Sequence, residues 1–234
     1  FKKINLMRTK NLLITSLFFL ISYGYSQEET PLNNPIYDNQ PYHFGFILGI
    51  SNTQFQITYN DVFTEQNSFD QIFSKYEPGF NVGIIMDLRL GNNLNLRLTP
   101  SFNFLDHKIY FIKNNTEIIE PKNTGVSNFE LPLYLKYRSD RINNGRVYIL
   151  LGSNFILDLS NEENSSQTNL DFKQTNYTAD IGFGIDMYFA YFKFSPEIKY
   201  SHGLRNMLNN QSNEISNQIK KLSTRAILVS LTFE

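Results

Sequence analysis

From residue 42 onward, the sequence alternates apolar and polar residues in eight runs, and this pattern limits the possible folds most strongly. In one run, Phe80, Val82 and Ile84 alternate with polar or small residues such as Asn81 and Gly83. A period of two is typical of β-strands, whose side chains point alternately to opposite faces. The predicted strands are His43 to Tyr59, Phe80 to Leu90, Leu94 to Phe104, Phe129 to Arg138, Gly145 to Asp158, Tyr177 to Met187, Tyr191 to His202 and Leu222 to Phe233.

The connections between these strands alternate between long and short. The short ones are Gly91 to Asn93, Ser139 to Asn144, which has hairpin-turn chemistry, and Phe189 to Ala190. The long ones are rich in Asn, Ser, Gln and Glu, as in Ser160 to Asn176 and Arg205 to Lys221. Short periplasmic turns and long extracellular loops are typical of outer-membrane barrels. The sequence therefore predicts an all-β fold, an eight-stranded antiparallel transmembrane β-barrel in the cell outer membrane.

The beginning of the sequence has the pattern of a secretory signal peptide. Met7 is the expected start, and the basic residues Arg8 and Lys10 precede an apolar stretch from Leu12 to Ile21, with Ser26 before the expected cleavage site. The alternative is a transmembrane anchor, but an anchor needs about 20 apolar residues and this stretch is shorter.

These patterns predict three parts of the chain. Residues 1–26 are expected to hold upstream residues and the signal peptide, residues 27–41 a periplasmic leader, and residues 42–234 the barrel. The leader contains Pro31, Pro35 and Pro41 between polar residues, so we expect a tail with little regular structure.

The composition agrees with a barrel, in which only alternate strand residues face lipid and the hydropathy signal is diluted. Hydrophobic residues make up 41% of the chain, and its mean hydropathy is -0.32. The net charge of -1 gives no reason to expect binding to nucleic acid. The sequence has no cysteine, which excludes disulfides and thiol chemistry.

Phe and Tyr are expected to form girdles at the two edges of the membrane. There are 21 Phe and 14 Tyr, and many fall near the ends of predicted strands. Aromatic girdles at both interfaces are a property of outer-membrane barrels. The expected periplasmic girdle contains Phe44, Tyr137, Phe192 and Phe233, and the expected surface girdle contains Phe80, Phe102, Phe104, Phe129, Phe155, Tyr177 and Tyr200.

The alternate polar residues of the strands share one face, and that face is expected to point into the lumen. It carries acidic and basic side chains. An eight-stranded barrel is only wide enough inside for side chains to fill it. We therefore expect these groups to satisfy one another as an ion-pair plug. A conducting pore is the alternative. The predicted plug contains Asp87, Arg89, Arg97, Glu130, Lys136, Arg138, Arg146, Asp180, Asp186, Lys193, Glu197 and Lys199.

The sequence contains no recognisable catalytic, cofactor or metal motif. Its histidines are His43, His107 and His202. His202 beside Ser201 and near Glu197 suggests a lipid-modifying outer-membrane hydrolase as an alternative, but adjacent strand residues point to opposite faces. We therefore expect no enzymatic activity, no cofactor and no metal site.

Three prolines fall inside predicted strands. Pro100, Pro132 and Pro196 each remove a backbone N–H from the ladder, and proline within a sheet is normally found at edges or bulges. A closed barrel has no edges, so we predict bulges at these positions.

Several short motifs recur along the predicted barrel in a characteristic order. They are Glu77-Pro78-Gly79-Phe80-Asn81-Val82-Gly83, Asp87-Leu88-Arg89-Leu90, Leu94-Asn95-Leu96-Arg97-Leu98-Thr99-Pro100, Glu130-Leu131-Pro132-Leu133, Gly182-Phe183-Gly184-Ile185-Asp186, Tyr191-Phe192-Lys193-Phe194-Ser195-Pro196-Glu197 and Leu231-Thr232-Phe233-Glu234. Together these motifs resemble the PorT family, also called SprT, of outer-membrane barrels in the Bacteroidota. The resemblance implies an accessory or assembly role in type IX secretion and gliding motility, with other secretion components and outer-membrane lipid as partners and no catalytic residues. A generic structural or adhesive barrel is the alternative.

Overall fold

The computed structural model describes residues 31–59, 71–113, 116–159, 172–209 and 219–234. The predicted signal peptide, the start of the leader and parts of all four predicted long loops lie outside these residues. The described elements are a 3-10 helix, η2 (Tyr37–Asn39), and the strands β1 (Tyr42–Tyr59), β2 (Gln71–Phe73), β3 (Glu77–Arg89), β4 (Leu94–Leu98), β5 (Ser101–Lys113), β6 (Thr116–Arg138), β7 (Gly145–Asp158), β8 (Thr175–Tyr188), β9 (Lys193–Gly203) and β10 (Ile219–Phe233).

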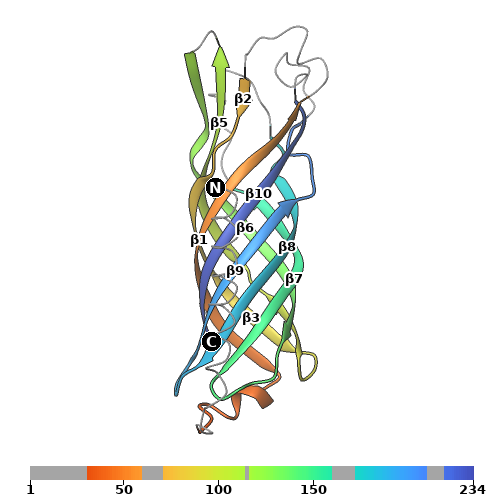
Figure 1. The fold of residues 1–234 in the computed structure, drawn as a ribbon. Helices are drawn as coiled ribbons and strands as arrows, with labels where there is room; N and C mark the ends of the chain where they lie inside the picture. Colours follow the sequence, from red (N-terminus) through yellow and green to blue (C-terminus); the bar gives the residue numbers. More distant parts are fainter. Residues whose placement is uncertain (1–30, 60–70, 114–115, 160–171, 210–218) are drawn as a thin grey trace, which may run out of the picture. The chain divides into compact units, whose positions relative to one another are not determined.

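The strands of residues 33–234 close into a barrel. β1 pairs antiparallel with β10 on one side and with β3 on the other, so the sheet has no free edge along most of its length (Figure 1). β4 and β5 together form one strand position of the ring, and we call each such position a stave. Both pair with β6 in one continuous register, in which Leu98 lies opposite Leu133 and Ser101 lies opposite Glu130. β2 is a short addition that pairs with β5. The ring therefore has eight staves, which confirms the predicted fold class.

The predicted bulges at the three prolines are wrong. The stave is interrupted at Thr99 and Pro100, but the Pro100 carbonyl still accepts a bond from the Ile84 N–H at 3.0 Å. Pro132 lies opposite Asn154, and Pro196 lies opposite Leu231, without a register shift. Each proline lacks only its own N–H, so the carbonyls and the neighbouring residues can keep the register.

One predicted loop is largely a strand hairpin. Between Leu105 and Asn128 the chain was expected to form a long polar loop, but β5 and β6 continue through it in antiparallel pairing, with Tyr110 opposite Ile119. The segment Ile109 to Ile112 is rich in the aromatic and β-branched residues that favour strands. Cross-strand pairing therefore extends this hairpin beyond the other staves at one end of the barrel (Figure 1).

We call this the loop end, and the opposite end the turn end. At the turn end, the short connections between β3 and β4, β6 and β7, and β8 and β9 reverse the chain. Asn143, in the second of these turns, has a φ of 53°, a left-handed conformation that asparagine tolerates well. This alternation matches the prediction of short turns at one end and long connections at the other.

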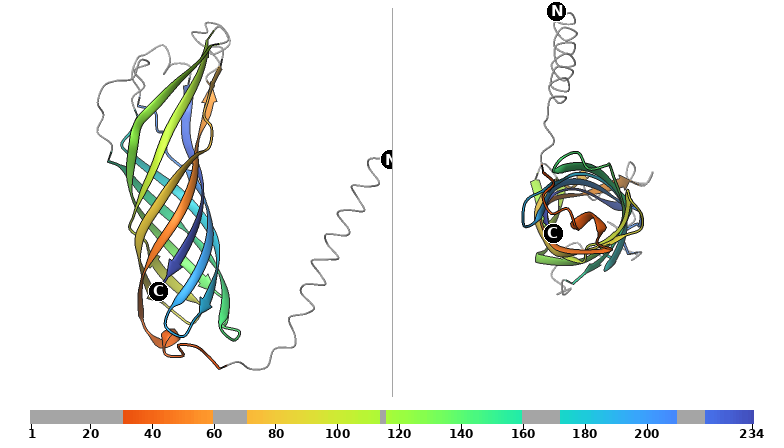
Figure 2. Two further views of the ribbon diagram at one scale, coloured as in Figure 1. Left: turned by 90° about the vertical axis from the view of Figure 1, so that its left-hand side faces the viewer. Right: turned by 90° about the horizontal axis from the view of Figure 1, so that it is seen from below.

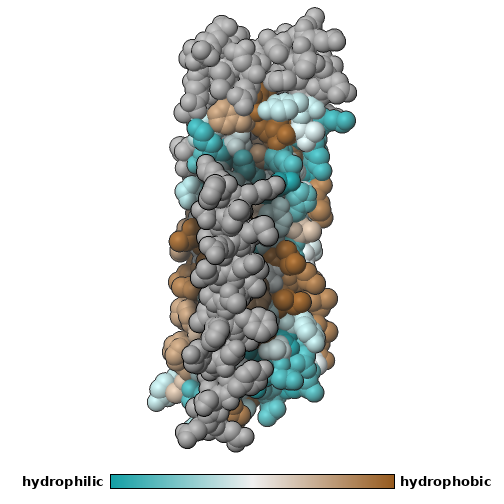
Figure 3. Space-filling model, in the orientation of Figure 1, coloured by the Kyte–Doolittle hydropathy of each residue, from teal (hydrophilic) through white to brown (hydrophobic). Residues whose placement is uncertain are grey.

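The barrel is polar inside and apolar outside. Inward residues such as Asn81, Asn95 and Ser195 are buried, whereas outward residues of the same strands, such as Ile84, Leu94 and Ile198, are exposed. Figure 3 shows hydrophobic side chains gathered on the outer wall around the middle of the barrel. The aromatic residues of both predicted girdles point outward, although Phe129, Phe155 and Phe233 are half-buried among neighbouring rings.

The residues just before β1 cover the turn end of the lumen. Figure 2, seen from below, shows η2 lying across the mouth of the barrel. From Asn33 onward, the predicted leader therefore packs against the barrel. In the described parts of the chain, no helix is long and apolar enough to cross a membrane.

Candidate functional site in the barrel lumen

Arg97 on β4 is the centre of the charged groups in the lumen. Its guanidinium contacts Asp87 on β3 at 2.8 Å, Glu197 on β9 at 2.6 Å and Glu234, just after β10, at 2.8 Å. Arg97 is only 1% exposed. The planar guanidinium has five N–H donors, so one arginine can bind several carboxylates at once.

Three lysines complete this arrangement. Lys136 binds Asp186 at 3.0 Å, Lys193 binds Glu234 at 2.8 Å, and Lys199 binds Glu197 at 2.9 Å. We call the whole group the lumen network. Its members are Asp87, Arg97, Lys136, Asp186, Lys193, Glu197, Lys199 and Glu234.

The lumen network is electrically balanced, with four acidic and four basic side chains. The Tyr148 hydroxyl also donates to Glu197 at 2.7 Å, and the Lys136 ammonium lies 3.7 Å from the centre of the Tyr148 ring. A buried charge is very costly unless it is paired and hydrogen-bonded. Here each charge has such a partner, and the side chains occupy the space that an eight-stranded barrel leaves.

Three of the predicted plug residues, all arginines, lie towards the turn end and outside the lumen network. Arg146 binds Asp38 at 2.5 Å, and Arg89 bonds to the Asp38 carbonyl. Arg141, which was not predicted, binds the Asp38 carboxylate at 3.2 Å. Arg138 is buried but forms no ion pair with any described residue. Asp38 therefore ties the leader to basic side chains at the barrel mouth.

The two remaining predicted plug residues, Glu130 and Asp180, bind neutral donors. Asn103 and Asn154 donate to Glu130 at 2.8 and 3.1 Å. Tyr134 donates to Asp180 at 2.8 Å. Seven of the twelve predicted residues thus meet in the lumen network, and these two lie apart from it.

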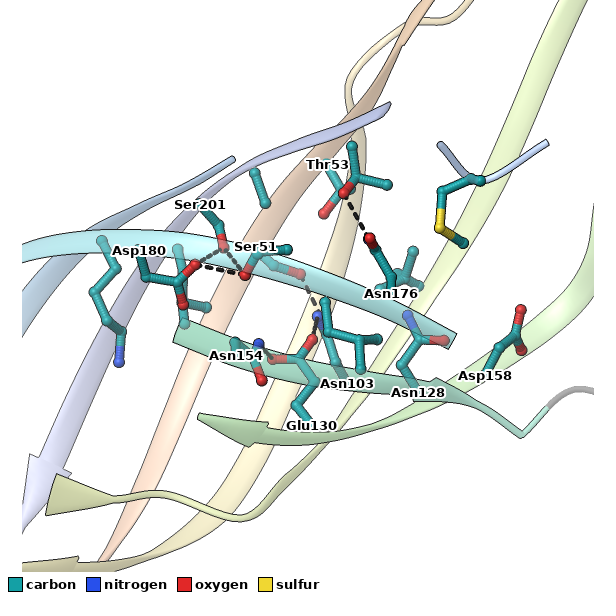
Figure 4. Close-up of a pocket in the computed structure, with 18 of the residues that line it drawn as sticks. Ser51, Thr53, Asn103, Asn128, Glu130, Asn154, Asp158, Asn176, Asp180 and Ser201 are labelled. Carbon is teal, nitrogen blue, oxygen red and sulfur yellow. Dashed lines mark hydrogen bonds between the residues drawn. The ribbon is translucent and has the colours of Figure 1, made fainter. Parts of the chain in front are cut away.

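Glu130 and Asp180 line a cavity of about 80 Å³ between the lumen network and the loop end (Figure 4). Figure 4 shows amide and hydroxyl side chains from several strands gathered around it. Phe55 and Met207 belong both to the cavity wall and to a buried apolar cluster with Ile72. The cavity therefore lies between a charged region and an apolar cluster in the same lumen.

The two described histidine side chains, His43 and His202, lie in different parts of the barrel. The His43 ring is buried, and its Nε2 lies 2.8 Å from the Tyr37 carbonyl oxygen. His202 lies on β9 beside Ser201, whose hydroxyl bonds to Asp180 and Thr178. The side chain of His107 lies outside the described residues. Within the described chain, no group of three His, Cys, Asp or Glu side chains could hold a metal ion.

Sequence reasoning missed Glu234, Tyr37 and Asp38. Glu234 continues the inward phase of Ser230 and Thr232, so the alternation itself could have identified it. The Tyr37 hydroxyl donates to Glu234 at 2.8 Å, and its ring stacks on His43. No periodic signal marks Tyr37 or Asp38, because they lie in an irregular segment.

Tyr37 anchors the leader in the barrel mouth. It is 6% exposed, and burial, with the Glu234 carboxylate as the next largest cause, raises the pKa of its phenol above the usual value. The phenol therefore stays protonated and can donate its hydrogen bond to Glu234.

Changing Tyr37 to alanine is expected to release this segment. The variant loses the hydrogen bond to Glu234 and the ring stacking on His43. Limited proteolysis of the folded barrel should cut the leader at least several-fold faster. Ile36→Ala is the matched control, because Ile36 is adjacent and exposed. Equal cleavage rates in Tyr37→Ala and the unmodified protein would contradict the anchoring role.

Comparisons with known proteins agree with this architecture. The sequence matches a family model described as outer membrane protein beta-barrel domain over residues 25–209. No curated protein matches the sequence significantly. The outer membrane protein OprG from Pseudomonas aeruginosa has a TM-score of 0.50 and 11% identity, over 81% of this chain and 94% of OprG. At that identity, the likeness shows the fold alone.

Two further solved structures have lower backbone similarity. Neisserial surface protein A has a TM-score of 0.43 and 12% identity, over 82% of this chain and 98% of that protein. Ail, the attachment invasion locus protein of Yersinia pestis, has a TM-score of 0.37 and 10% identity, over 83% of this chain and 98% of Ail. Because the family model covers most of the sequence and the strands close into a ring, the chain belongs to the outer membrane protein β-barrel domain family and is a protein of the outer membrane.

Proposed function

We propose that this protein is a non-conducting, non-enzymatic barrel that serves as an accessory or assembly component of the type IX secretion and gliding machinery. The lumen network is the observation that supports a non-conducting barrel, since buried ion pairs join β3, β4, β6, β8 and β9 across the lumen. The secretion role is supported by the order and spacing of the PorT-like motifs. Outer-membrane lipid is the partner that the apolar outer wall contacts.

The proposal that the barrel does not conduct ions is directly testable. Purified protein reconstituted into planar bilayers should show no stable single-channel steps, because moving ions would have to displace paired side chains such as Arg97 and Lys136. A general porin inserted into the same bilayers is the positive control. Steady, reproducible channels from this protein would exclude the non-conducting barrel.

Among the described residues, Ser201 has no hydrogen bond to a histidine, which the hydrolase alternative would require. In the acyl-transfer mechanism, a serine hydroxyl is hydrogen-bonded to a histidine base. Here the Ser201 hydroxyl lies within hydrogen-bonding distance of the Asp180 carboxylate and the Thr178 hydroxyl. A lipase or acyltransferase assay on the refolded barrel, with Ser201→Ala as the comparison, should therefore show no activity that depends on this hydroxyl.

A deletion strain tests the secretion role. Loss of the gene should abolish the release of type IX cargo into the medium and stop gliding, and a plasmid copy should restore both. The Arg97→Lys variant should support cargo release only if the variant still folds in the membrane. Heat-modified mobility on a gel measures whether it is folded. Normal cargo release in the deletion strain would leave a structural or adhesive barrel as the remaining function.

A further inference from the structure

The cavity between the lumen network and the loop end has acidic walls that it does not neutralise itself. Glu130 and Asp180 are both buried there. Within the described chain, no basic side chain forms an ion pair with either carboxylate, and their partners are amides and hydroxyls such as Asn103 and Tyr134. Such neutral donors stabilise a carboxylate but leave its charge in place.

Lys199 is the basic side chain in the cavity wall, and it is already engaged. Its Nζ binds Glu197 at 2.9 Å within the balanced lumen network. If Lys199 turned away to neutralise Glu130 or Asp180, Glu197 would lose one of its cationic partners. Buried charges are normally paired, so the cavity has the electrostatics of a site for a cation.

An unused acceptor in the wall supports a ligand that donates hydrogen bonds. Asn154 is 4% exposed and lines the cavity. Its Nδ2 donates to Glu130, which fixes the orientation of the amide, and its Oδ1 has no hydrogen-bond partner. A carboxylate offers about four lone-pair positions. Glu130 accepts two bonds from protein donors, so it has acceptor capacity to spare.

Part of the wall is apolar, which favours an organic cation over a metal ion. Leu105, Ile156 and Leu228 line the cavity beside Met207. The described residues offer no set of three acidic or histidine ligands for a metal. A volume of about 80 Å³ has room for several non-hydrogen atoms, since one water needs about 10–15 Å³ on this measure.

We propose that this cavity binds a small organic cation, a primary amine that is protonated at neutral pH and carries a short apolar body. The ammonium group lies between Glu130 and Asp180 and donates to Asn154 Oδ1. The apolar body packs against Leu228 and Met207. This site is independent of the proposed secretion role, because it depends only on the walls of the cavity.

Matched probes of nearly equal size test the proposal. Isothermal titration calorimetry on the full refolded barrel in detergent micelles compares propylammonium chloride, 1-propanol and sodium propionate. Propylammonium should bind one site with a Kd on the order of 1 mM or lower, which is reasonable for so few atoms. The alcohol and the carboxylate should bind at least tenfold more weakly. Calcium chloride and magnesium chloride form the metal arm of the experiment.

Variants locate the binding site. Glu130→Gln and Asp180→Asn should each raise the Kd for propylammonium at least tenfold. Asp140→Asn removes the same charge from an exposed residue at the turn end and should leave the Kd unchanged. Ala226→Leu keeps every charge but fills part of the cavity, so it should abolish binding. Heat-modified mobility on a gel shows which variants are folded. If Glu130→Gln and Asp180→Asn do not fold, the effect of Ala226→Leu on propylammonium binding tests the location of the site.

Several results would overturn the proposal. Absence of saturable propylammonium binding would show that the cavity holds only water. Equal binding of 1-propanol would remove the role of the two carboxylates, and tighter binding of calcium would assign the site to a metal ion. Unchanged binding by folded Ala226→Leu would place the amine elsewhere on the protein.

Discussion

Replacing Arg97 with alanine is expected to lower the free energy of unfolding by about 3–5 kcal/mol, because it removes one partner from a buried group of opposite charges. Asp87, Glu197 and Glu234 each lie within 2.8 Å of the Arg97 guanidinium. In the variant, these carboxylates share only the remaining lysines, and the lumen network changes from balanced to a net charge of -1. The carboxylates then remain buried with too few cations.

Equilibrium unfolding by urea in lipid vesicles, followed by heat-modified mobility, measures this change. Lys220→Ala is the control, since Lys220 is an exposed basic residue on β10 and its loss should change stability by less than about 0.5 kcal/mol. Arg97→Lys should fall between the two, because an ammonium keeps the charge but cannot reach three carboxylates in the same way. A loss for Arg97→Ala no larger than that for Lys220→Ala would mean that the lumen network does not stabilise the fold.

Placing an arginine at Val229 is expected to cost about 2–4 kcal/mol, the penalty for this charge on the lipid face near the bilayer midplane. Val229 is 53% exposed on the outer wall. It pairs with Ile50 on β1 and with Ile198 at the middle of β9, and both are also exposed. These three side chains form a row that faces lipid about halfway along the barrel.

Ile142→Arg is the matched control for this second prediction. It introduces the same side chain at an exposed apolar residue of a turn, beyond the ends of the strands, where the cost should be about 0–1 kcal/mol. Refolding yield and unfolding in lipid vesicles compare the two variants. Equal tolerance of both would mean that Val229 does not face lipid and that the register of β10 is shifted by one residue.

The strand predictions were successful because alternation is a local property. Each predicted strand overlaps a stave of the barrel, and residues such as Asp87 and Lys136 point inward as their phase required. The hairpin of β5 and β6 was less predictable. Its polar residues resembled a loop, and pairing between the two strands rather than alternation within one of them decided its structure.

The contacts in the lumen depend on which strands face one another across the barrel. Arg97 and Glu234 are 137 positions apart, and their contact requires closure of the ring and the stagger of every stave between them. Glu130 and Asp180 share the phase of the lumen network but lie nearer the loop end, where they meet amides and hydroxyls. The alternation of inward and outward residues alone could not separate Glu130 and Asp180 from the members of the lumen network.

The sequence by itself determined which side chains face lipid and which face the lumen, because a strand period of two needs no knowledge of the partner strands. The tertiary structure alone decided the pairing of the charges, the cavity beside Glu130 and the docking of Tyr37 in the barrel mouth. These features depend on the depth of each residue along the barrel and on contacts between distant parts of the chain. Depth follows from strand tilt and stagger, which are properties of the closed ring and not of any single strand.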